Sequence, residues 1–164
     1  MKWIRSLIFV LLLALLLPTF SCTRQEAMPW ELVESLLSEA EEVPSGVLYR
    51  SDAEEGSEAY ASPALLRSLY GEGAEERFTA VEAYAIYLAS FATPCEIAVF
   101  SCYSSTDANR LETLCLRRAE EVRVALRGTP YEAVSAELRV WAKGRMVFFL
   151  LCEDAERLGR EILQ

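Results

Sequence analysis

Residues 138–152 read LRVWAKGRMVFFLLC, in which two apolar segments stand on either side of Lys143 and Gly144. A short glycine-containing turn between two such segments is typical of a β-hairpin, so 138–142 and 146–152 are predicted to be antiparallel strands. Alternate residues of a strand point to opposite faces of a sheet, and in 146–151 both alternating sets are apolar. A solvated face would carry polar residues instead. Both faces of this sheet are therefore expected to be covered.

A second pair of strands is predicted upstream of the hairpin. Residues 81–91 and 96–103 are rich in β-branched and aromatic residues, and Ala-Thr-Pro at 92–94 is typical of a turn between them. An amphipathic helix follows each pair of strands, over 107–127 and 153–163. The sequence thus predicts an α+β fold, with a four-stranded antiparallel sheet in β-β-α-β-β-α order and both helices on one face.

The part of the chain before this unit is predicted to form a helical arm. Apolar residues recur at helical spacing over 30–43, after Pro29 at the first helical position. This helix is the nearest candidate to cover the second face of the sheet. Residues 51–61 are acidic and contain glycine, as an exposed loop does. The predicted division is a signal peptide at 1–21, a tether and helical arm at 22–78, and an α+β domain at 79–164.

The first residues carry the features of an export signal. Lys2 and Arg5 precede an unbroken apolar run over 7–17, which Pro18 ends. These eleven residues would extend only about 16 Å as a helix, too short for a hydrocarbon core of about 30 Å. The run is therefore interpreted as the core of a cleaved signal and not as a permanent membrane span.

The residues that follow the signal resemble a bacterial lipobox. Thr19-Phe20-Ser21 leads to Cys22, the position at which a lipobox cysteine receives a diacylglycerol group. Lipidation of Cys22 is expected on this ground. Two alternatives stay open: ordinary cleavage after Ser21, which would release a secreted protein, and an uncleaved anchor.

Charge and the absence of histidine exclude several classes of function. Loss of Lys2 and Arg5 with the signal leaves 14 basic against 25 acidic side chains, a net charge of about −11. Such a surface repels nucleic acid, so none is expected as a partner. A chain without histidine cannot build a Ser-His-Asp triad or a histidine-containing metal site. No phosphate-binding glycine motif occurs either, and no cofactor or metal is expected.

Four cysteines remain after Cys22, an even number that allows three disulfide pairings in an exported protein. They are Cys95, Cys102, Cys115 and Cys152. Their spacing lacks the C-x-x-C of thioredoxin-like and zinc-binding sites. Buried thiols that act as small apolar side chains, and at least one disulfide, both remain open.

Other candidate sites each have an ordinary structural interpretation. The acidic residues between Asp52 and Glu58 could ligate calcium, but they miss the EF-hand pattern and are interpreted as a solvated loop. Arg117, Arg118 and Arg123 are expected on the wet side of their helix. Five aromatic residues could line a binding face, although sheet packing is the simpler interpretation. These are Tyr84, Tyr87, Phe91, Tyr103 and Trp141.

The order and spacing of several segments resemble a family of bacterial lipoproteins known only as domain of unknown function 4358. The segments are Glu96-Ile97-Ala98-Val99-Phe100, the charged helix after it, Ala142-Lys143-Gly144 before an apolar strand, and Asp154-Ala155-Glu156 at a final helix. The resemblance covers 81–164 together with the signal and Cys22. It implies a place outside the cytoplasmic membrane, and it carries no known activity or site residues.

Taken together, the sequence favours an exported bacterial envelope protein, held by lipid at the outer face of the cytoplasmic membrane. Its domain is expected to bind another envelope protein or an envelope ligand without catalysing a reaction. An envelope hydrolase with paired carboxylates is the alternative. Two facing acids in a cleft would favour the hydrolase, and a flat apolar or aromatic face would favour the binding domain.

Overall fold

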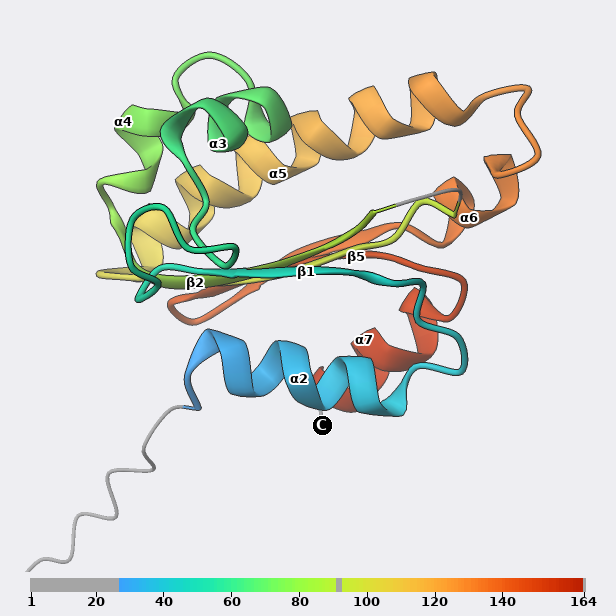
Figure 1. Cartoon of the computed structure of the whole chain (residues 1–164), viewed down its shortest axis with the longest axis horizontal. Coiled ribbons are helices and arrows are strands. Elements are labelled where there is room, and N and C mark those ends of the chain that lie inside the picture. The colour runs from blue at the N-terminus through green and yellow to red at the C-terminus, as the bar shows by residue number, and fades with distance from the viewer. Residues whose placement is uncertain (1–26, 91–92, 164) are drawn as a thin grey trace, which may run out of the picture.

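The computed structural model describes residues 27–90 and 93–163 of the chain. Within them, five strands form one antiparallel sheet in the order β1-β2-β3-β5-β4, and six helices pack on its two faces (Figure 1). The strands are β1 (Gly46–Arg50), β2 (Val81–Ala89), β3 (Glu96–Cys102), β4 (Arg139–Lys143) and β5 (Met146–Leu151). The predicted α+β class with an antiparallel sheet is therefore confirmed.

The two predicted hairpins lie side by side through their apolar strands. β3 is buried along its whole length, because β2 pairs with it on one side and β5 on the other. Val99 lies opposite Ala85 on β2 and Phe148 on β5. The β4–β5 turn uses Gly144 at φ 62°, a left-handed conformation that glycine adopts without steric cost.

One face of the sheet is covered by four helices, drawn above the sheet in Figure 1. They are α3 (Pro63–Tyr70), α4 (Ala74–Phe78), α5 (Ser105–Leu126) and α6 (Glu132–Glu137). The long helix α5 buries Leu111, Cys115 and Val122 against Phe100 and Phe149 of the sheet. This layer forms the larger of two hydrophobic cores.

The opposite face is covered by α2 (Pro29–Glu39) and α7 (Ala155–Leu163). α2 contacts β2 and β3, and α7 contacts β4 and β5. Val33 and Leu36 of α2 are buried in this second core, as is Leu158 of α7. The prediction that the helix within 30–43 covers the second face is confirmed.

Two finer parts of the fold prediction are wrong. The sheet has five described strands where four were predicted, because the short segment Gly46–Arg50 pairs with β2 at the sheet edge. The helices do not share one face, because the C-terminal helix α7 packs beside α2. The physical reason is the length of α2, whose eleven residues span about 16 Å. A helix of this length covers the second face over β2 and β3 but not over β4 and β5, and α7 covers that remaining part.

Candidate functional site

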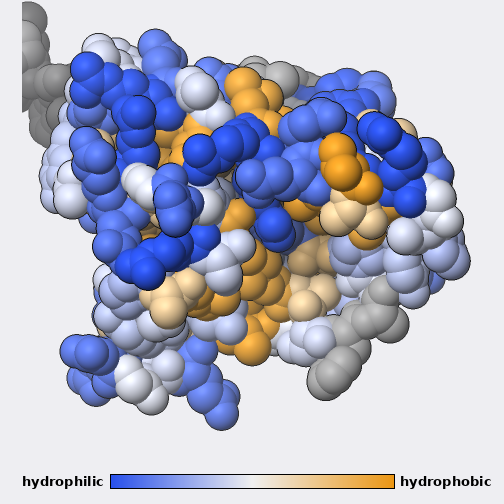
Figure 2. Space-filling view, turned by 90° about the horizontal axis from the view of Figure 1, so that it is seen from above, coloured by the Kyte–Doolittle hydropathy of each residue, from blue (hydrophilic) through white to orange (hydrophobic). Residues whose placement is uncertain are grey.

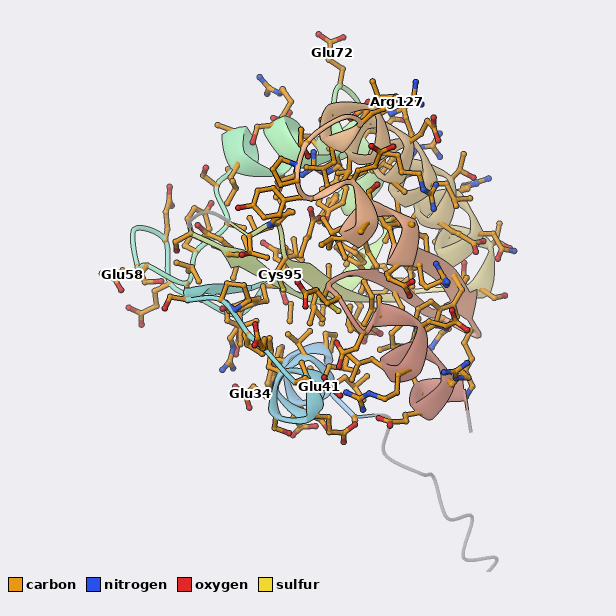
Figure 3. The ribbon with its side chains drawn as sticks, turned by 90° about the vertical axis from the view of Figure 1, so that its right-hand side faces the viewer. Glu34, Glu41, Glu58, Glu72, Cys95 and Arg127 are labelled. Carbon is orange, nitrogen blue, oxygen red and sulfur yellow. The ribbon has the colours of Figure 1, made fainter. Side chains whose placement is uncertain are left out.

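A pocket lies at one end of the sheet, where three connecting segments meet. It has a volume of about 370 Å³. We call it the strand-end pocket, and it is lined by Glu42, Val43, Pro44, Thr93, Pro94, Cys95, Cys152 and Glu153. Figure 3 has this end of the molecule toward the viewer, with Cys95 near the centre and Glu58 and Glu72 pointing outward.

Each wall of the strand-end pocket is the end of a regular element. The 42–44 wall connects α2 to β1, the 93–95 wall leads into β3, and the 152–153 wall leaves β5. The first wall is held to the sheet by the Tyr87 hydroxyl, which donates a hydrogen bond to the Pro44 carbonyl oxygen. The Glu41 amide also donates to Asp154 Oδ2 at 3.3 Å. The first contact ties the 42–44 segment to β2, and the second ties the residue before it to the start of α7.

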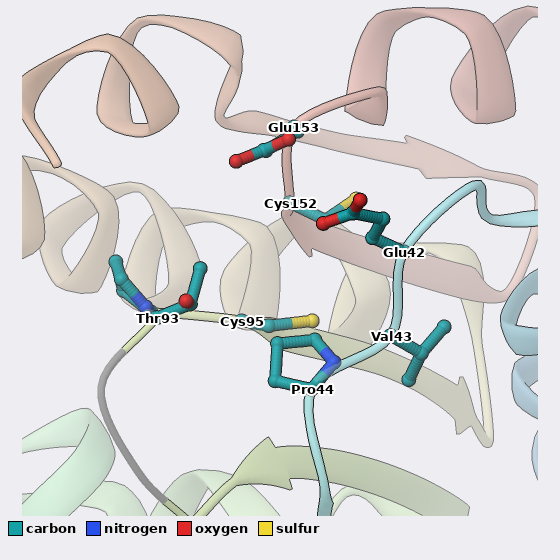
Figure 4. Close-up of a pocket in the computed structure, with 8 residues that line it drawn as sticks. Glu42, Val43, Pro44, Thr93, Cys95, Cys152 and Glu153 are labelled. Atoms are coloured by element: carbon teal, nitrogen blue, oxygen red, sulfur yellow. The ribbon is translucent and has the colours of Figure 1, made fainter.

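The floor of the pocket carries two thiols. Cys95 and Cys152 are both buried in the second core, and Figure 4 shows their sulfur atoms projecting to the same side of two neighbouring strands. Burial raises the pKa of the Cys95 thiol to about 11, and Asp154 and Glu96 add to the rise. Burial and then the neighbouring Cys95 raise the pKa of Cys152 to about 12. Both thiols are therefore protonated at neutral pH and are poor nucleophiles.

The rim of the pocket is acidic. Glu42 and Glu153 are exposed to solvent. In Figure 4 both carboxyl groups lie toward the Cys152 side of the pocket, and that of Glu42 is drawn beside the Cys152 sulfur. The lining residues that the structure describes include no lysine or arginine. The strand-end pocket thus combines an apolar, uncharged floor with a negatively charged entrance.

A second polar centre is buried in the larger core, on the opposite face of the sheet from the two pocket thiols. Glu96 is 2% exposed, accepts a hydrogen bond from the Tyr70 hydroxyl at 3.0 Å, and pairs with Arg118 Nη2 at 3.1 Å. Burial raises the pKa of the Glu96 carboxyl, although Arg118 and Tyr70 partly oppose this. Burial also raises the pKa of the Tyr70 hydroxyl well above its usual value. Both carboxylate oxygens are occupied by protein groups, as in a structural ion pair.

This centre corrects the prediction for the arginines of α5. Arg118 was expected on the wet side, but its side chain is only 23% exposed and reaches the buried Glu96. Arg117 is half-exposed and donates to the Tyr70 carbonyl oxygen at 2.6 Å. The spacing could have revealed the position of Arg118, because it lies seven residues after the buried Leu111 and four before the buried Val122.

The other predicted candidates do not meet in one site. Asp52 of the acidic loop pairs with Arg50 at 2.7 Å, and this hydrogen bond lowers the pKa of the Asp52 carboxyl. Tyr84 packs in the larger core, Tyr87 and Trp141 pack in the second, and Tyr103 is 62% exposed. Trp141 stacks on Phe148 with ring centroids 4.8 Å apart. The aromatic residues therefore serve mainly as sheet packing. Phe91 and Cys22 lie outside the described residues.

Apolar side chains also reach the surface outside the strand-end pocket. Figure 2 looks onto the α3–α5 side, where hydrophilic side chains crowd the surface and apolar atoms show between them. The large hydrophobic residues that are exposed belong to separate segments. Among those described, they are Met28, Val43, Tyr103, Leu116 and Val124. Single exposed apolar residues are normal on a protein surface and indicate no docking site by themselves.

No protein-family model matches the chain, and no curated protein or solved structure does so either. Across residues 27–90 and 93–163, none of the helices has the length and apolar character needed to cross a bilayer. The same part of the chain contains no group of three or more Cys, Asp or Glu side chains placed to hold a metal ion.

Proposed function

We propose that the chain is an exported bacterial lipoprotein, anchored through Cys22 at the outer face of the cytoplasmic membrane, whose domain binds a ligand without catalysing a reaction. The basic and apolar signal, the lipobox-like residues before Cys22 and the resemblance to the lipoprotein family known as domain of unknown function 4358 support the location. Membership of that family is part of the proposal.

The chemistry of the strand-end pocket supports binding of a cationic group with an apolar neighbour. Its volume of about 370 Å³ falls within the range of ligand pockets, which is roughly 300–1,000 Å³. The single observation that carries the proposal is its composition, with Glu42 and Glu153 at the rim and uncharged residues below. Amines and guanidinium groups are attracted to such a rim, whereas phosphates and carboxylates are repelled. A basic side chain of an envelope protein or peptide fits this description.

The hydrolase alternative has less support from the described residues. A carboxyl that acts as a general acid sits in an apolar environment, whereas Glu42 and Glu153 are both exposed. The buried Glu96 is held by Arg118 and Tyr70 and does not line the strand-end pocket. No separate observation favours hydrolysis.

The binding proposal is tested with a short peptide that carries one lysine next to a phenylalanine. We expect the chain to bind this peptide and to bind its lysine-acetylated form several times more weakly, measured by calorimetry at low salt. Glu42→Gln with Glu153→Gln should weaken binding about two- to thirtyfold, since exposed charge pairs contribute about 0.2–1 kcal/mol each.

The matched control carries two charge-neutralising changes far from the pocket, Glu58→Gln in the acidic loop and Glu72→Gln before α4. It has the same net charge as the pocket variant and should retain the original affinity within about twofold. Equal weakening in both double variants would mean that general charge attraction, and not the strand-end pocket, binds the peptide. Equal affinity for the acetylated peptide would contradict recognition of a cation.

A further inference from the structure

Cys95 and Cys152 occupy directly opposed positions on neighbouring strands. The last paired residues at this end of the β3–β5 ladder are Glu96 and Leu151, so Cys95 and Cys152 are the next pair outward. At the other end the Cys102 amide donates to the Arg145 carbonyl oxygen at 2.9 Å, which marks a hydrogen-bonded pair. Hydrogen-bonded and non-hydrogen-bonded pairs alternate along an antiparallel ladder. The pair of Cys95 and Cys152 lies seven steps along the ladder from the hydrogen-bonded pair of Cys102 and Arg145, so it is a non-hydrogen-bonded pair.

This position has the geometry that a disulfide requires. Cα atoms of a non-hydrogen-bonded pair lie about 4.5 Å apart, within the roughly 4.4–6.8 Å found for disulfides. Both side chains lie on the second-core side of the sheet and line the strand-end pocket. Their sulfur atoms project to the same side in Figure 4, so rotation about the side-chain bonds can bring them together without moving the strands.

The sheet excludes the pairings that would join a cysteine on one face to a cysteine on the other. Cys102 and Cys115 belong to the larger core on the opposite face, so the sheet backbone separates them from Cys95 and Cys152. Cys102 and Cys115 share one core, but both side chains are 0% exposed and line no part of the strand-end pocket, so an oxidant in solvent does not reach them.

We propose that Cys95 and Cys152 form a disulfide when the chain meets a disulfide-bearing oxidant, and that this bond fixes the floor of the strand-end pocket while Cys102 and Cys115 stay as thiols. Formation of this bond in the cell rests on the proposed export, because disulfide-bearing oxidants act outside the cytoplasm. Its formation in the purified chain does not depend on export. The structure described above is the reduced form.

The reaction is a thiol–disulfide exchange in two steps. The thiolate of one cysteine attacks a sulfur of the donor disulfide, which releases one donor thiolate and leaves a mixed disulfide. The second cysteine then attacks the protein sulfur of the mixed disulfide and releases the other donor thiolate. The two protein thiols lose two protons and two electrons, and the donor disulfide takes them up as two thiols.

The test uses the purified full chain and oxidised glutathione at about pH 9, where more of each thiol is ionised. Free thiols are then blocked with N-ethylmaleimide, and the chain is cut with trypsin and with a protease specific for glutamate. Cleavage after Glu96 separates Cys95 from Cys102, so mass spectrometry distinguishes the possible links. We expect a peptide pair joined through Cys95 and Cys152, with Cys102 and Cys115 carrying the blocking group.

Variants and stability give independent readouts. The Cys102→Ser and Cys115→Ser chains should still form the link, whereas Cys95→Ser should leave Cys152 free to be blocked. Oxidation should raise Tm by about 5–15 °C in the original chain, since the bond closes a long loop, and should leave Tm unchanged in Cys95→Ser. A link through Cys102 or Cys115, or unlinked Cys95 and Cys152 after full exposure to the oxidant, would overturn the inference.

The two proposals fail separately. A purified chain that forms the link although cell fractionation finds it in the cytoplasm would contradict the export and support the disulfide. An exported chain that never forms the link, even when purified and oxidised, would contradict the disulfide alone.

Discussion

Replacing Leu36 with alanine measures how firmly α2 closes the second face of the sheet. The Leu36 side chain is 4% exposed and packs in the second core with Val33 and residues of β2 and β3. Truncation of a buried leucine costs about 2–5 kcal/mol, because apolar contacts are lost and a cavity remains. A typical domain has only about 5–15 kcal/mol in total, so Leu36→Ala should be strongly destabilising.

Urea unfolding followed by tryptophan fluorescence provides the measurement. With a slope of about 2 kcal/mol/M, the expected loss moves the unfolding midpoint down by about 1–2.5 M. Leu37→Ala is the matched control, since it removes the same atoms from the next, half-buried position of α2. The control should cost about 1 kcal/mol. A loss under about 0.5 kcal/mol for Leu36→Ala, or equal losses for both variants, would mean that α2 does not cover the sheet in solution.

Three further outcomes are expected. Arg118→Met should cost about 3–5 kcal/mol at pH 7, because it leaves the Glu96 carboxylate buried and unpaired. This loss of unfolding free energy should shrink as the pH falls toward 4.5, because a protonated Glu96 has no charge to bury. Burial already raises the pKa of Glu96 in the folded state, which favours the protonated form. Urea unfolding of both chains at pH 7 and pH 4.5 measures the difference. Cys22→Ser should lose an acyl label and move from the membrane to the soluble fraction, and a soluble original chain would instead indicate ordinary signal cleavage. Brief digestion with a glutamate-specific protease should first cut within 54–58, where the chain is exposed, and a first cut within β3 would contradict the sheet.

The elements with a clear apolar pattern could be predicted from the sequence. Four strands and the helix after each hairpin follow from periodicity, because that pattern reflects burial directly. β1 could not be assigned to the sheet, since five residues at an edge carry too little pattern. The amphipathic pattern of α7 shows that one side is apolar but not which face of the sheet it covers. The connection through Cys152 and Glu153 decides that.

The strand-end pocket was beyond the reach of sequence patterns for a related reason. Its walls come from three connecting segments that lie far apart in the chain, and connections have no periodicity to read. Cys95 and Cys152 could be recognised as apolar positions, but their opposition depends on the β3–β5 register. The sequence therefore predicted the layers of the protein much better than the place where their ends meet.

The start of α2 at Pro29 limits how far an anchored domain can stand from its membrane. Six residues separate Pro29 from Cys22, so the chain between them can extend at most about 25 Å. With lipid on Cys22, the α2 end of the fold would be confined to a thin layer next to the bilayer, and the rest of the domain could reach only its own length beyond it. Partners of the strand-end pocket would then have to be membrane-bound themselves or small enough to diffuse to the membrane surface.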